Sequence, residues 1–268
     1  LSESGGFIVV CISYRLGALG YIFSEDSECR DLGLQDQTCA LRWVREHIHL
    51  FGGDPDRVTV AGQSAGAYSV QCLISRTREP LFSKAIIMSS PLVLSLSESR
   101  ARRTARKFSD FLGKDIMDAD ISEIVSAQVR TEKPSGPGMV YMPLCSTSVK
   151  DGAAPSLREV LITSQQDDGN PFSPAAWLSP LLTWAIFRAP VKNYRRSLEK
   201  HGIKTSQMLL TWRHKDGLQG ATHTAELPLL FGDWALWKDV PMVRGCEERE
   251  YIQQRDALRT RISEFVKG

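Results

Sequence analysis

One pentapeptide in the chain has the residue types and spacing of a serine nucleophile. Gly62-Gln63-Ser64-Ala65-Gly66 follows the pattern Gly-x-Ser-x-Gly, which places a serine on a sharp turn between a strand and a helix. The apolar run Val58-Thr59-Val60 ends just before the motif, and small residues follow it, as this geometry requires. Glycines two positions before and after the serine allow the strand and the helix to approach closely. We therefore expect Ser64 to be a nucleophile held in a strained backbone conformation.

A serine hydroxyl becomes a good nucleophile only when a base accepts its proton and donors stabilise the resulting oxyanion. The backbone N–H of Ala65 opens the expected helix and points, with the helix dipole, to the place where an oxyanion forms. Of the five histidines, His223 lies in a Gly-Ala-Thr loop after a predicted strand, where a catalytic base is usually presented. The other four are expected to be structural or exposed: His47, His49, His201 and His214.

The base also needs an acid that orients it. Asp168 follows a predicted strand and precedes Gly169, so it should share one edge of the sheet with Ser64 and His223. Asp167 is the nearest rival, and an ordinary Asp-Asp-Gly turn is the alternative for both. The chain order Ser64, Asp168, His223 is that of the α/β-hydrolases and differs from the orders in chymotrypsin and subtilisin.

The elements that must position these residues have the pattern of a parallel α/β protein. Apolar, β-branched runs without alternation indicate strands buried on both faces. Helical spacing is expected over residues 34–51, after Ser64 and over 97–132, and a loop over 134–155. We predict a single domain over residues 1–268, with a mostly parallel central sheet flanked by helices. The predicted strands are Phe7–Tyr14, Arg57–Ala61, Ala85–Met88, Glu159–Thr163 and Met208–Trp212.

Composition narrows the function classes only a little. The 268 residues are 42% hydrophobic and carry a formal net charge of +2, so no strong field favours nucleic acid or an anionic membrane. No run has the pattern of a signal peptide or a membrane span, and the compartment and oligomeric state stay open. The six cysteines lack metal-type spacing and are expected to be buried thiols: Cys11, Cys29, Cys39, Cys72, Cys145 and Cys246.

With these residues in place, the chain resembles the type B carboxylesterase and cholinesterase-like family. The resemblance rests on four segments, Val10–Gly17, Asp31–Pro55, Val58–Val70 and Gly220–Gly232. It implies an α/β-hydrolase fold and a serine carboxylic-ester hydrolase that acts on a small-molecule ester through an acyl-enzyme, without cofactor or metal. The implied roles are nucleophile for Ser64, base for His223, orienting acid for Asp168 and oxyanion donor for Ala65.

Some positions depart from the family pattern. The family acid stands in a segment spelled like Asp-Glu-Gly, so Asp168 replaces a glutamate, and Gln63 stands where many members have Glu. Ser90 matches a buried serine that supports the acid in relatives, and a plain turn hydroxyl is the alternative. Trp177, Trp184 and Phe187 could line a substrate pocket, but we expect them in the core.

The resemblance also implies an incomplete domain. Family members carry a Gly-rich oxyanion turn and further strands before the segment that matches Phe7–Tyr14, whereas this sequence begins after them. The interval from Asp168 to His223 looks shorter than in relatives, which also continue beyond Gly268. Loss of one oxyanion donor lowers kcat by roughly 10² to 10³. A catalytically impaired or non-catalytic binding protein of the same fold is therefore the alternative function.

Overall fold

A computed structural model describes residues 1–91, 96–133, 140–144, 149, 152–173, 175–213 and 220–268. The chain divides into two compact units. The first comprises residues 1–10, 44–93 and 147–268, and the second comprises residues 11–43 and 94–146. The predicted nucleophile, base and acid all belong to the first unit, so its geometry decides the site.

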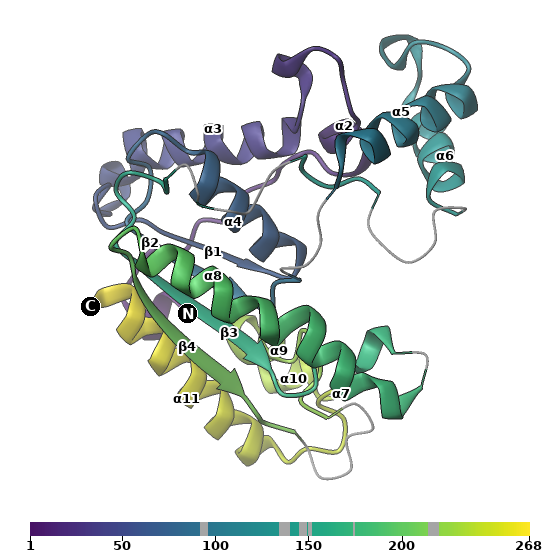
Figure 1. Cartoon of the computed structure of the whole chain (residues 1–268). Helices are drawn as coiled ribbons and strands as arrows, with labels where there is room; N and C mark the ends of the chain where they lie inside the picture. The colour runs from purple at the N-terminus through teal and green to yellow at the C-terminus, as the bar shows by residue number, and fades with distance from the viewer. Residues whose placement is uncertain (92–95, 134–139, 145–148, 150–151, 174, 214–219) are drawn as a thin grey trace. The chain divides into compact units, whose positions relative to one another are not determined.

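A parallel sheet of four strands, in the order β1-β2-β3-β4, forms the centre of the first unit (Figure 1). The register aligns Gln63 with Met88 and Met88 with Thr163, so the carboxyl ends of the strands lie at one edge. Four of the five predicted strands are confirmed, with shifted ends. Their bounds are β1 Thr59–Gln63, β2 Lys84–Met88, β3 Glu159–Gln165 and β4 Lys204–Leu210.

The predicted strand over Phe7–Tyr14 is wrong. Residues 7–16 form neither helix nor strand, and Ile8, Val9, Val10 and Ile12 are 40–42% exposed. β-Branched residues favour a strand only where a neighbouring strand can pair with them. Within the described part of the chain, β1 pairs with β2 alone, and no strand pairs with this segment.

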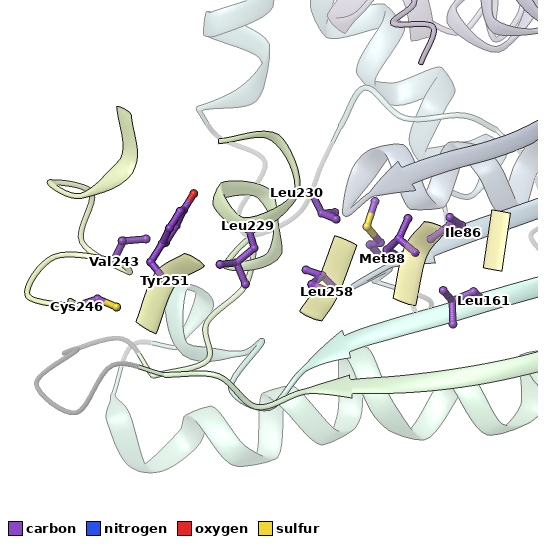
Figure 2. Close-up of a cluster of buried hydrophobic side chains, with 10 residues drawn as sticks. Ile86, Met88, Leu161, Leu229, Leu230, Val243, Cys246, Tyr251 and Leu258 are labelled. Atoms are coloured by element: carbon purple, nitrogen blue, oxygen red, sulfur yellow. The ribbon is translucent and has the colours of Figure 1, made fainter. Parts of the chain in front are cut away.

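Helices cover both faces of this sheet. Figure 1 shows α8 and α11 on opposite faces. Leu258 of α11 belongs to an apolar cluster with Ile86, Met88 and Leu161 of the strands, which Figure 2 shows. The helices of this unit are α1 Ser2–Gly5, α4 Ala65–Arg76, α7 Ser179–Leu182, α8 Ala189–Glu199, α9 Glu226–Phe231, α10 Trp234–Trp237 and α11 Glu248–Lys267. Its described residues also form short 3₁₀-helices and a π-helix: η2 Ile48–Phe51, η4 Asn170–Phe172, η5 Ala176–Leu178 and the π-helix Thr183–Arg188.

The second unit is helical. A capping box at Asp120 and Glu123 starts α6, and Phe108 of α5 packs with Ile124 and Ala127 of α6 in one buried cluster. Within the predicted loop over 134–155, the described residues form neither helix nor strand. The elements are α2 Gly17–Tyr21, η1 Ser27–Cys29, α3 Leu32–His47, which continues into the first unit, α5 Glu98–Leu112, η3 Ile116–Asp118 and α6 Ile121–Glu132.

The expectation of buried thiols holds for two of the described cysteines. Cys72 and Cys246 are buried, whereas Cys11, Cys29 and Cys39 are exposed, and all five are free thiols. Cys145 lies outside the described residues. Among the helices that the structure describes, none is long and apolar enough to cross a membrane.

Candidate active site

Ser64 stands at the turn between β1 and α4. Its backbone has φ 54° and ψ −115°, a conformation that is strained for any residue with a side chain. The backbone N–H of Ser64 donates to the Met88 carbonyl over 2.9 Å, which fastens the turn to β2. A Cβ at Gly62 would lie 2.3 Å from the Gly66 carbonyl oxygen, so only glycine fits there.

The second glycine of the motif has a different environment. A Cβ added at Gly66 would meet no atom within 4 Å outside its own helical backbone. The expectation that both glycines make room for the strand and the helix therefore holds for Gly62 and not for Gly66. Ala65, the first residue of α4, is exposed, and an N–H in the first turn of a helix has no intrahelical acceptor.

Three residues from separate segments of the first unit meet at the carboxyl edge of the sheet. His223 Nε2 lies 2.8 Å from Ser64 Oγ, and His223 Nδ1 lies 2.9 Å from Asp168 Oδ1. His223 is 6% exposed and Asp168 is fully buried. The sequence predicted this grouping, and the arrangement allows the histidine to bridge a hydroxyl and a carboxylate.

The carboxylate of Asp168 is held on both oxygens. Oδ2 accepts hydrogen bonds from the Gln165 backbone N–H at 2.7 Å and from the Ser89 hydroxyl at 3.2 Å. The expectation that Ser90 supports the acid is wrong, because the Ser90 hydroxyl donates to Gln71 Oε1 at 2.7 Å. Ser89 takes that place from a backbone with φ 48°, a left-handed conformation that residue type alone does not indicate.

Asp167, the rival acid, fastens the loop that carries His223. Its Oδ2 accepts from the Ala221 backbone N–H at 2.9 Å, and its own N–H donates to the Ala221 carbonyl. Thr222 forms an isolated parallel bridge with Asp167. Gly220 has φ 64°, and a Cβ there would lie 2.4 Å from Asp167 Oδ2, so the loop requires glycine. Asp167 thus holds the base in place through the backbone.

Two phenylalanines pack against the imidazole. The ring centroids of Phe172 and Phe187 each lie 5.2 Å from that of His223, and the two phenylalanine rings stack at 5.9 Å. Phe187 is buried, as expected. The expectation of a core position is wrong for Trp177 and Trp184, which are 78% and 60% exposed, because large apolar side chains also occur on surfaces.

Gln63 lies beside the base. Its side-chain Nε2 is 3.4 Å from His223 Nε2, the nitrogen that also faces Ser64. The amide therefore reaches the same ring atom as the hydroxyl, at the position where many family members have a glutamate.

Sequence reasoning missed a buried carboxyl group three residues after His223, at the start of α9. Glu226 is 1% exposed, and its Oε2 accepts from the Gln165 side chain at 2.6 Å. Burial, the largest influence, raises the pKa of Glu226, and the nearby charge of Asp168 raises it further. The amide of Gln165, the backbone N–H of Glu226 and the charge of His223 act in the opposite direction. The signal in the sequence was a lone acidic residue in the apolar segment 225–231.

The other histidines take positions away from this cluster. His47 ends α3, His49 lies in η2, and His201 follows α8 with Nδ1 2.8 Å from the Ser197 carbonyl. His214 lies outside the described residues. Among the side chains that the structure describes, no group of three or more His, Cys, Asp or Glu could hold a metal ion.

Comparisons with known proteins identify the family of this chain. The sequence profile of the carboxylesterase family matches residues 1–135, half of the chain. This chain belongs to the carboxylesterase family. A probable N-octanoylanthranilate hydrolase of Rhodococcus erythropolis is 35% identical to it. The alignment covers 99% of the present chain and 66% of the Rhodococcus protein. The para-nitrobenzyl esterase of Bacillus subtilis (strain 168) is 41% identical over 48% of the chain and 27% of its own length.

The solved structure of a carboxylesterase from Geobacillus stearothermophilus superposes on 99% of this carboxylesterase-family chain with a TM-score of 0.83. At 24% identity, this match establishes the α/β-hydrolase fold, which the sequence predicted. It covers 67% of that structure. The chain thus spans about two thirds or less of the length of the relatives named here.

Proposed function

We propose that this chain carries the site of a serine hydrolase that cleaves carboxylic esters through an acyl-enzyme. One observation carries the proposal: Ser64 Oγ lies 2.8 Å from His223 Nε2 while Asp168 Oδ1 lies 2.9 Å from the opposite ring nitrogen. The strained backbone of Ser64 and membership in the carboxylesterase family support it.

In the acylation step, Ser64 Oγ attacks the acyl carbon of the ester while His223 Nε2 accepts the hydroxyl proton. The carbonyl oxygen becomes an oxyanion that the Ala65 backbone N–H stabilises. Asp168 holds Nδ1–H and favours the imidazolium. When the C–O bond to the alcohol breaks, His223 returns the proton to the departing alcohol oxygen, and the acyl group stays on Ser64.

In the deacylation step, a water molecule takes the place of the alcohol. His223 Nε2 accepts a proton from the water as its oxygen attacks the acyl carbon. Collapse of the second tetrahedral intermediate releases the carboxylic acid and returns the proton to Ser64. The two steps need no redox partner and no group beyond water, and the substrate is a small-molecule ester.

An N-acylated aromatic amine is a second candidate substrate. The name of the Rhodococcus erythropolis relative, which aligns with 99% of this chain, denotes the amide of octanoic acid and anthranilate. The same steps cleave an amide when His223 protonates the departing nitrogen. Rates for 4-nitrophenyl octanoate and N-octanoylanthranilate, measured side by side, decide between the two substrate classes.

The alternative is a non-catalytic protein of the same fold. The small number of oxyanion donors favours this alternative. Among the described residues, the backbone N–H of Ala65 is the one donor that we assign to the oxyanion. Intact-mass spectrometry after exposure to a fluorophosphonate separates the two readings, with Ser64→Ala as the control. We expect one phosphonyl adduct on the parent chain and none on the variant. A soluble, cooperatively unfolding parent chain that takes up no adduct supports the non-catalytic alternative.

A further inference from the structure

An exposed apolar surface lies beside the proposed acyl-transfer site in the first unit. The helical backbone runs on from η5 through α7 and the π-helix into α8, and Figure 1 shows α7 continuing into α8. Trp177, Leu181 and Trp184 follow one another at spacings of four and three residues, which places them on one side of a helix. They are 78%, 58% and 60% exposed. Together with Phe172 of η4, which is 52% exposed, these side chains form the aromatic face.

The aromatic face is fastened to the active site. The backbone N–H of Gly169, the residue after the acid, donates to Thr183 Oγ1 of the π-helix at 2.8 Å. A Cβ at Gly169 would lie 2.6 Å from the Ser179 carbonyl oxygen, so α7 packs directly on the turn that carries the acid. The ring of Phe172 contacts that of His223, with the centroids 5.2 Å apart. A surface that binds the aromatic face is therefore close to the proposed catalytic base.

The segment that carries the aromatic face contains no negative charge. Residues 169–198 include no aspartate or glutamate, although 31 of the 268 residues of the chain are acidic. Within this segment, residues 170–187 include no charged side chain of either sign. An anionic surface can therefore approach this part of the chain without meeting a carboxylate that belongs to it.

Basic side chains follow the aromatic face along α8. Lys192 and Arg196 of α8 and Lys200 directly after it are exposed, at intervals of four residues. This spacing places them on one side of the helix, and the buried residues of α8 pack against the sheet on the other. Lys192 stands eight residues after Trp184, which is roughly 12 Å along a helix with a rise of 1.5 Å per residue. Cations thus flank the aromatic face at a short distance.

We propose that the aromatic face docks on an anionic lipid surface, with the exposed basic side chains of α8 directed to its headgroups. A helical surface with tryptophan, phenylalanine and leucine beside lysine and arginine is typical of proteins that lie in the plane of a lipid interface. An indole ring suits this place because it is apolar and carries one polar N–H. The formal net charge of the whole chain is only +2, so the attraction comes from this local group of cations.

The same charges oppose a second copy of the chain as the partner. In a symmetric dimer one surface meets itself, so the basic side chains of two α8 helices would approach each other. Anionic headgroups neutralise these cations instead. Docking also brings esters that dissolve in lipid close to Ser64, and this consequence, unlike the docking itself, rests on the proposed function.

Co-sedimentation of the whole chain with phosphatidylcholine vesicles that contain about 30% phosphatidylserine tests the proposal. We expect the parent chain to bind, and Trp177→Ser/Trp184→Ser to lower its partition onto the vesicles at least about tenfold, because two large apolar anchors are lost. The matched control, Leu50→Ser/Met117→Ser, replaces two exposed apolar side chains of η2 and η3 and should bind as the parent chain does. Ser64→Ala should also bind normally, which separates docking from catalysis.

A charge variant tests the contribution of α8. Lys192→Gln/Arg196→Gln should weaken binding to the phosphatidylserine vesicles at least about tenfold and leave binding to pure phosphatidylcholine unchanged. Cooperative thermal unfolding shows which variants are folded, and the charge variant decides the question if the tryptophan variant is not. The proposal is overturned if the parent chain stays in the supernatant, if the folded variants bind as the parent does, or if the Leu50/Met117 control loses binding equally. A dimer in sedimentation velocity that the tryptophan variant abolishes would assign the aromatic face to a second copy and also overturn it.

Discussion

Replacement of Asp168 by asparagine tests the role of the buried acid most directly. The two oxygens of Asp168 accept from three donors: His223 Nδ1, the Gln165 backbone N–H and the Ser89 hydroxyl. An asparagine offers one oxygen and one NH₂ group, so it cannot accept at both positions. The backbone N–H of Gln165 is always a donor, which places the amide oxygen at the Oδ2 position and the NH₂ group toward His223.

This orientation reverses the tautomer of the base. His223 Nδ1 must then accept a hydrogen bond, which puts the ring proton on Nε2, opposite Ser64 Oγ. A protonated Nε2 cannot take the serine proton. The wrong tautomer lowers kcat by about 10⁴ in Ser-His-Asp enzymes, and at 1.36 kcal/mol for each factor of ten this corresponds to about 5.4 kcal/mol of transition-state stabilisation.

Steady-state hydrolysis of 4-nitrophenyl butyrate measures this loss, with Asp167→Asn as the matched control. The described contacts of the Asp167 carboxylate are one hydrogen bond, from the Ala221 backbone N–H, and an exposed ion pair with Arg213 at 4.0 Å. We therefore expect at most about a tenfold loss of kcat, since one hydrogen bond contributes ~1 kcal/mol and an exposed ion pair less. Circular dichroism must show that both variants remain folded. The reasoning is refuted if folded Asp168→Asn stays within tenfold of the parent chain, or if Asp167→Asn loses as much activity.

Three further predictions follow from the same site. Gly62→Ala should lower the free energy of unfolding by about 1–3 kcal/mol, because the new methyl group overlaps the Gly66 carbonyl; urea denaturation measures it, and an equal loss in Gly66→Ala contradicts the reasoning. Ser89→Ala should lower kcat about fivefold, the effect of one hydrogen bond of ~1 kcal/mol to the acid. Ser90→Ala should leave kcat unchanged. A larger loss of kcat in Ser90→Ala than in Ser89→Ala would indicate that Ser90 supports the acid. Because the pKa of Glu226 is raised on folding, the folded state binds more protons than the unfolded state between about pH 4.3, the ordinary pKa of a glutamate, and the higher pKa of the folded state. The parent chain should therefore lose stability relative to Glu226→Gln as the pH rises through that region, and a constant difference in urea midpoint from pH 4 to pH 8 would contradict this sign.

The nucleophile and the base could be predicted from the residues next to them in the sequence. The strand, the small residues and the glycine that the turn requires all stand within a few positions of Ser64, so one contiguous stretch encodes the elbow. His223 is similar, since its loop is shaped by the neighbouring Gly220, whose left-handed backbone could be expected from residue type. The strands β2 and β3 were predictable because their buried residues are mostly apolar without alternation. The predictions for β1 and β4 rested on shorter apolar runs, whose residues are only partly buried.

Tertiary structure decided the partners, because they depend on atoms that are distant along the chain. Ser89 and Ser90 are identical in type, and a backbone torsion at Ser89 determines which hydroxyl reaches Asp168. Asp167 and Asp168 are likewise adjacent, and the position of the His223 loop separates the one that meets the imidazole from the one that holds the backbone.

The pairing of strands and the burial of a single carboxyl group could not be predicted from the sequence alone. Phe7–Tyr14 has the composition of a strand, but hydrogen bonding between strands needs a second backbone, and the described residues provide none for it. Glu226 is an ordinary glutamate in the sequence, and only the folded chain surrounds its carboxyl group and raises its pKa. The sequence by itself thus determined which residues have the chemistry and the local backbone for a nucleophile and its base. The fold decided which side chains orient them, because hydrogen bonds and desolvation depend on distances in space.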